Sequence, residues 1–147
     1  MKIRTGFVSN SSSSSFLIIG KDINIPKIDS EKLCIPKTFG GCYEFGWGPE
    51  EFSDVGSRIN FAMIQALNMD DREKDMLDKV LKESFNIDKI ENKLHDDWNF
   101  DKKYCAYIDH QSCASEGMNT KIFESEDTLI KFLFSDDSII HVDNDNH

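Results

Sequence analysis

With 147 residues the chain fits one domain, and 39% hydrophobic with 30% charged residues is a globular composition that excludes a disordered chain. Asp and Glu outnumber Lys and Arg by 27 to 17, which gives a formal net charge of −10. Such a protein is repelled by nucleic-acid phosphates, so we expect a basic protein as its partner and no direct nucleic-acid binding. The charge also keeps a protein soluble whatever it binds.

No apolar run approaches the roughly 18 residues of a membrane span. The basic residues Lys2 and Arg4 near the N-terminus are not followed by the apolar core, about 7 residues or more, of a secretory signal. We therefore expect a protein that stays in the cytoplasm of the cell that makes it, does not enter membranes and has cysteines that are reduced thiols.

A serine-rich segment, residues 9–15, separates Gly6–Val8 from the apolar run Phe16–Ile19. Serine runs are typical of hydrated linkers, but apolar flanks favour an ordered arm. We divide the single domain of residues 1–147 into a Ser-rich arm, residues 1–15, and a globular body, residues 16–147. Phe16–Ile19 is predicted to be a strand buried on both faces.

The string GFVSNSSSSSF at residues 6–16 resembles the N-termini of many small uncharacterised proteins encoded by bacteriophages and prophages. The resemblance covers about residues 1–19 and implies a phage-related origin. It carries over no catalytic residue, because the proteins that share the string have diverse bodies.

An irregular connection, Lys21–Lys37, is predicted next. Apolar and polar residues then alternate over Cys42–Trp47, which predicts a half-buried strand that ends at Gly48-Pro49. Its aromatic side chains form an interaction surface if they are exposed and the core face of a sheet if they are buried. The candidate binding residues are Tyr43, Phe45, Trp47 and Phe52.

Three helices are predicted in the middle of the chain, over about Asp54–Asn68, Asp71–Ser84 and Ile87–Trp98. The second begins with Asp70 as N-cap and Glu73 three residues on, the pattern of a capping box. The third is predicted from apolar residues spaced three and four positions apart.

The last third predicts a strand, Tyr104–Ile108, a short strand at 121–123, a buried helix capped by Ser125, and a strand, Ser138–Val142. A strand, a helix and a strand in succession indicate a right-handed parallel crossover.

Polar residues follow both strands of this predicted crossover, and open α/β sheets place ligands at such strand ends. His and Asp are ligands for a divalent metal, and an Asp also orients a His for acid–base chemistry. The alternative is a set of solvated strand ends, where Asp and Ser favour turns. The candidate catalytic residues are Asp109, His110, Ser112, His141 and Asp143.

The expected fold is α+β or α/β, with a small mixed sheet of about four to five strands covered by about four helices. The leading functional hypothesis is a phage-related acidic accessory protein that binds a basic host protein of nucleic-acid handling or defence, as an inhibitor or counter-defence factor. A binding role is favoured over an enzyme, and no cofactor is assigned. The alternatives are a small metal-assisted hydrolase and a binder of a nucleotide-like ligand, both built on Asp109, His110, His141 and Asp143.

Overall fold

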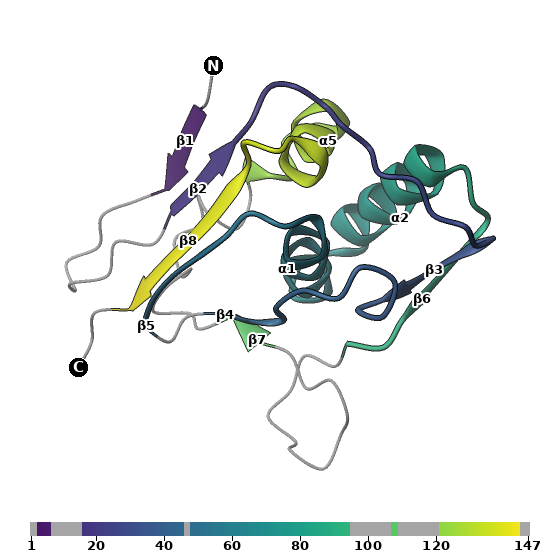
Figure 1. Ribbon diagram of the computed structural model, residues 1–147, viewed down its shortest axis with the longest axis horizontal. Helices are drawn as coiled ribbons and strands as arrows, with labels where there is room; N and C mark the ends of the chain where they lie inside the picture. Colours follow the sequence, from purple (N-terminus) through teal and green to yellow (C-terminus); the bar gives the residue numbers. More distant parts are fainter. Residues whose placement is uncertain (1–2, 7–15, 46–47, 95–106, 109–120, 145–147) are drawn as a thin grey trace, which may run out of the picture.

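The computed structural model describes residues 3–6, 16–45, 48–94, 107–108 and 121–144 (Figure 1). Only the backbone is described for residues 3–6, 16, 48–49, 107–108 and 143–144. Among these residues no helix is long and apolar enough to cross a membrane.

One face of the molecule is a four-stranded antiparallel sheet in the order β1-β2-β8-β5. Its strands are β1 (Ile3–Gly6), β2 (Phe16–Ile19), β8 (Ile139–Asn144) and β5 (Gly48–Phe52). The predicted strands at Phe16–Ile19 and Ser138–Val142 are thus confirmed. Leu17 pairs with Ile140 at the centre of the sheet, and both side chains are fully buried. Part of the predicted arm belongs to the sheet, because β1 pairs with β2, whereas residues 7–15 lie outside the described residues.

The strand predicted over Cys42–Trp47 is reduced to β4 (Glu44–Phe45), which pairs in parallel with β7 (Tyr107–Ile108). Gly48-Pro49 was predicted to end that strand, and this prediction is wrong, because these residues begin β5. Proline has no N–H to donate and is tolerated on an edge strand, which is the position of β5.

The first two predicted helices are confirmed as α1 (Val55–Leu67) and α2 (Asp71–Phe85). Asp54 caps α1 by accepting a hydrogen bond from the N–H of Ser57, and the predicted capping box of Asp70 with Glu73 is present. The helix predicted after Ser125 is α5 (Glu126–Phe134), and the Ser125 hydroxyl accepts from the N–H of Thr128.

The third predicted helix, Ile87–Trp98, is wrong in the part that the structure describes. Asn86 adopts the left-handed conformation (φ 53°) and ends α2. The chain then forms β6 (Lys89–Asn92), which pairs in parallel with β3 (Lys32–Ile35), a strand inside the connection predicted to be irregular. Ile87 and Leu94 are buried on either side of β6, so the spacing that predicted a helix reflects burial at the two ends of a strand.

The predicted parallel crossover is also wrong. β7 pairs with β4, whereas β8 lies between β2 and β5 with both neighbours antiparallel, so the two strands belong to different sheets. Ile122 and Phe123, predicted as a short strand, form a buried turn before α5.

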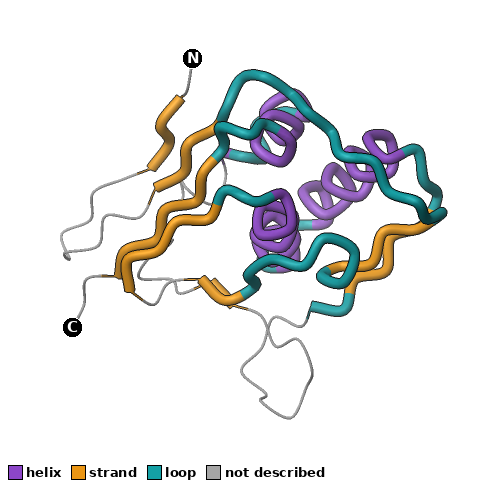
Figure 2. Tube along the Cα trace, in the orientation of Figure 1, coloured by secondary structure: helices purple, strands orange, loops and turns teal. Residues whose placement is uncertain are grey.

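The helices lie between the four-stranded sheet and the β3–β6 pair (Figures 1 and 2). Aromatic rings connect strands to helices. The ring of Phe45 in β4 packs edge-on against Phe52 of β5 and Phe61 of α1, with ring centroids 5.1 and 5.2 Å apart. Phe61 in turn contacts Phe132 of α5, with ring centroids 6.1 Å apart. The fold is therefore α+β, as expected, with antiparallel and parallel pairings in separate sheets rather than in one mixed sheet.

Leu133 of α5 is fully buried, so Leu133→Ala is expected to lower the free energy of unfolding by about 2–5 kcal/mol, because it leaves a cavity. Leu67 of α1 is 40% exposed and provides the control, since Leu67→Ala is expected to cost less than about 1 kcal/mol. Urea unfolding of both variants tests this, and equal losses would contradict the central position of α5.

The exposed Glu91 of β6 gives a pH prediction. Its carboxylate lies 2.9 Å from Lys32 Nζ and 3.3 Å from Lys93 Nζ, and these hydrogen bonds and charges lower the pKa of Glu91 from 4.5 to about 2. Since the folded pKa is the lower one, the stabilising effect is present above pH 4.5 and is lost as the pH falls towards 2. In an NMR titration, Lys32→Met is expected to raise the Glu91 midpoint more than Lys93→Met does. A midpoint that stays the same in both variants would show that the lysines do not set it.

Candidate functional site

A loop at residues 40–42 packs closely on the first turn of α1. Gly41 has φ 87°, and a Cβ on it would lie 2.4 Å from the Ser57 nitrogen. A Cβ on Gly56 would lie 2.6 Å from the carbonyl oxygen of Gly40. Any larger residue at either position would push the loop off the helix, so this close contact between loop and helix requires glycine on both sides.

Side chains of α1 hold the loop in place. Asn60 Nδ2 donates to the carbonyl oxygens of Gly40 and Cys42, each at 3.0 Å. The N–H of Cys42 donates to Ser57 Oγ at 2.8 Å, and Ser57 Oγ donates in turn to Asp54 Oδ2 at 2.9 Å. Ser57 and Asn60 are buried, and these bonds satisfy them, so they support the loop.

Arg58 is the most heavily engaged polar side chain of α1. It is 3% exposed; its Nε donates to the carbonyl of Leu133 at 2.9 Å, and its Nη1 donates to the carbonyls of Ser53 and Ser138 at 2.7 and 3.1 Å. Burial lowers the pKa of the guanidinium, while the negative charges of Asp136 and Asp54 raise it. Arg58 therefore carries a positive charge that joins the start of α1, the end of α5 and the start of β8.

Carboxylates gather around this junction. Burial raises the pKa of the Cys42 thiol. The hydrogen bond from Sγ to the carbonyl of Glu44, at 2.9 Å, lowers this pKa in part, and the charges of Glu50, Glu44 and Asp54 raise it again. Cys42 is thus a neutral thiol beside three carboxylates, which makes it a poor nucleophile. Asp54 is linked to Cys42 through the Ser57 hydroxyl, and its charge acts on Arg58 together with that of Asp136.

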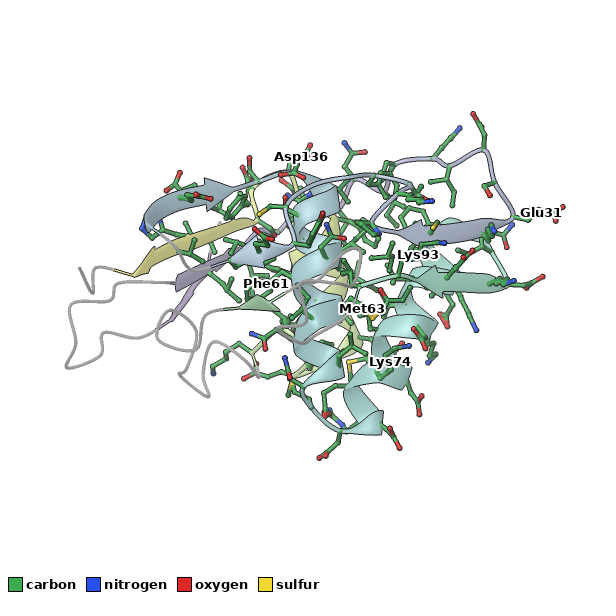
Figure 3. All side chains as sticks on the ribbon, turned by 90° about the horizontal axis from the view of Figure 1, so that it is seen from below. Glu31, Phe61, Met63, Lys74, Lys93 and Asp136 are labelled. Carbon is green, nitrogen blue, oxygen red and sulfur yellow. The ribbon has the colours of Figure 1, made fainter. Side chains whose placement is uncertain are left out.

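We call Glu44, Glu50, Asp54 and Asp136 the acidic face. All four are exposed, and none forms an ion pair with a lysine or arginine in the part of the chain that the structure describes. In Figure 3, Asp136 lies on the opposite side of the molecule from Lys74 of α2. On α2, Glu73, Asp78 and Glu83 form ion pairs, as in the pair of Lys74 with Asp78 at 2.7 Å, whereas the exposed Asp71 and Asp75 have no ion-pair partner among the described residues.

Overall acidity was read from the sequence, but the acidic face was not. Its signal is local: residues 38–57 contain Glu44, Glu50, Glu51 and Asp54 without a single lysine or arginine. Asp136 joins them only through the fold, because α5 ends beside the first turn of α1.

The structure describes one part of the predicted His/Asp cluster. His141 Nδ1 lies 3.2 Å from Glu51 Oε1, its register partner across β5 and β8. Asp109, His110 and Ser112 lie outside the described residues, and so does the side chain of Asp143. Because β7 and β8 are in different sheets, the crossover that was to bring these residues together is absent.

The predicted aromatic binding residues divide by burial. Phe45 is fully buried and belongs to the core, whereas Tyr43 and Phe52 are half-buried and pack against it. Trp47 lies outside the described residues. The core interpretation therefore holds for Phe45, and a surface role stays open for the others.

Among the described residues no three His, Cys, Asp or Glu side chains are grouped to hold a metal ion. An open groove of about 780 Å³ lies at the start of β3 and β6. Its lining includes Asp29, Glu31 and Asp88 interspersed with Lys32 and Lys89. Such a polar lining of mixed charge differs from the mostly apolar pockets that take small ligands.

No protein-family model, no curated protein and no solved structure matches this chain.

Arg58→Met is expected to lower the free energy of unfolding by about 2–4 kcal/mol, because it leaves buried carbonyls without a donor. Arg58→Lys is expected to restore only part of the loss, since an ammonium does not reproduce the planar arrangement of guanidinium donors. Lys82→Met, an exposed residue of α2, is the control for loss of a positive charge. Thermal unfolding of the three variants provides the measurement, and an Arg58→Met variant as stable as the control would show that water replaces the guanidinium.

Proposed function

We propose that this protein is a phage-related acidic accessory protein that acts by binding, and that a basic segment of a host nucleic-acid-handling or defence protein docks on the acidic face. The single observation that carries the proposal is the gathering of Glu44, Glu50, Asp54 and Asp136 without lysine or arginine partners among the described residues.

Unpaired carboxylates set up a field that paired ones do not. Part of the negative charge on α2 is cancelled nearby, as in the pairs of Lys74 with Asp78 and of Lys79 with Glu83. The charge of Arg58 offsets part of the field of Asp54 and Asp136, and the remaining field of the acidic face extends into solvent and is screened over about 8–10 Å at physiological salt. A basic partner is therefore attracted during approach, and electrostatic complementarity of this kind acts on the association rate first.

The same field repels nucleic acid. A protein that attracts a basic surface and repels phosphates competes with nucleic acid for that surface, which is the action expected of an inhibitor. This role needs no catalytic residue, because no covalent bond has to be made or broken.

The experiment compares two double variants of equal charge. Glu50→Gln with Asp136→Asn removes two charges from the acidic face, and Asp71→Asn with Asp75→Asn removes two exposed charges from α2. A labelled peptide rich in lysine and arginine is the probe. The association rate of the unaltered protein is expected to fall steeply as salt rises, and the acidic-face variant is expected to associate at least about tenfold more slowly than the α2 variant.

Capture from a bacterial lysate extends the test to natural partners. A basic protein held by the unaltered chain and by the α2 variant, and lost with the acidic-face variant, supports the proposal. Equal loss in both variants would show that overall charge, rather than the acidic face, controls binding. An association rate that does not change with salt concentration would also contradict the proposal.

A further inference from the structure

An extended segment, residues 21–29, runs from the end of β2 past α5 and α2 towards β3 (Figure 1). We call it the strap. Ile23 forms an isolated antiparallel bridge with Ser135, and the N–H of Asn24 donates to the carbonyl of Phe134 at 2.7 Å. Asn24 Nδ2 also donates to Asp136 Oδ2 at 3.3 Å. The strap is thus fixed along one edge to the end of α5.

The strap exposes apolar side chains. Ile23 and Ile25 are 45% and 37% exposed, and in the described part of the chain the other exposed large hydrophobic residue is Leu67. Residues two positions apart point to the same side of an extended chain. The two isoleucines therefore form one small apolar surface.

Among the described residues nothing pairs with the outer edge of the strap. In an extended chain the main-chain groups alternate between the two edges, so Asn24 faces α5 and its neighbours face away. No hydrogen bond from the described residues reaches the N–H or C=O of Ile23 or Ile25. A strand edge with unpaired main-chain groups is a template for another strand.

The charge beside the strap selects the occupant. On the strap itself Lys21 and Lys27 balance Asp22 and Asp29, whereas the turn on its inner side adds the exposed Asp136 and Asp137. Asp136 is at the same time part of the acidic face. An occupant that places cations here meets negative charge, and one that is acidic is repelled.

We propose that an extended segment of the basic partner adds as a strand along the outer edge of Ile23–Ile25. Its apolar side chains pack on the two isoleucines, and its lysines or arginines lie towards Asp22, Asp136 and Asp137. This inference rests on the proposed function and specifies the partner as a segment that alternates apolar and basic residues. Main-chain pairing supplies affinity and the alternating side chains supply specificity, as in other cases of strand addition.

Two short labelled peptides of equal charge serve as probes, one alternating lysine with valine and the other lysine with serine. The unaltered protein is expected to bind the lysine–valine peptide about tenfold more tightly, since only valine buries apolar surface on the strap. Ile23→Ser with Ile25→Ser is expected to abolish this preference and to leave the salt dependence of binding unchanged. Leu67→Ser is the matched control and is expected to retain the preference, because Leu67 lies at the end of α1.

Each outcome decides something. A preference for the valine peptide that survives in the Ile23/Ile25 variant would overturn the strap as docking site. If binding still depended on salt, the proposed role of the acidic face would be unaffected. Equal binding of both peptides by the unaltered protein would also overturn the strap as docking site. Failure to bind either peptide would overturn both proposals. N-methylation of the peptide's main chain is expected to weaken binding, and unchanged affinity would contradict strand pairing. Thermal unfolding checks that the variants fold, which we expect because the replaced side chains are exposed.

Discussion

The Arg58 guanidinium is the constraint on which the arrangement of the elements around α1 depends. It donates to the carbonyl of Ser53, five residues before it, and to those of Leu133 and Ser138, 75 and 80 residues after it. The Leu133 carbonyl lies in the last turn of α5, where carbonyl groups lack helical partners and a positive charge is favourable. A buried cation bonded only to carbonyls is costly without nearby negative charge, and Asp54 and Asp136 supply that charge from the surface.

The acidic face follows from this constraint. Asp54 caps α1 and Asp136 follows α5, so Arg58 fixes the separation of the two carboxylates when it ties the helices together. The glycine contact at Gly41 and Gly56 holds the loop that leads to Glu44 against the same helix turn. The acids that we propose as the docking surface are thus placed by buried groups, and the surface is formed before a partner arrives.

Local sequence signals predicted three of the four expected helices correctly and did not predict how the strands pair. Helix caps act within a few residues, so Asp70 and Ser125 were predicted as caps from the sequence, whereas Asp54 was predicted inside the helix that it caps. Strand pairing depends on distant partners: nothing near Lys89–Asn92 shows that Lys32–Ile35 lies beside it, and the spacing of Ile87, Ile90 and Leu94 predicted a helix instead. The predicted His/Asp cluster failed at its topological step for the same reason, since β8 pairs with β2 and β5 through contacts far apart in the sequence.

Two strand edges in the described part of the molecule, on β3 and β5, are protected, which sets the strap apart from them. On β3 the N–H of Cys34 donates to Thr38 Oγ1 and its carbonyl accepts from the N–H of Thr38, so the outer edge is occupied by the chain itself. On β5 a proline and two glutamates, Pro49, Glu50 and Glu51, oppose pairing with another chain. The strap has neither device at Ile23 and Ile25, and it is joined to the acidic face by the hydrogen bond between Asn24 and Asp136. A basic segment drawn in by the acidic face therefore meets the open edge beside it, and long-range attraction and short-range pairing act on the same partner.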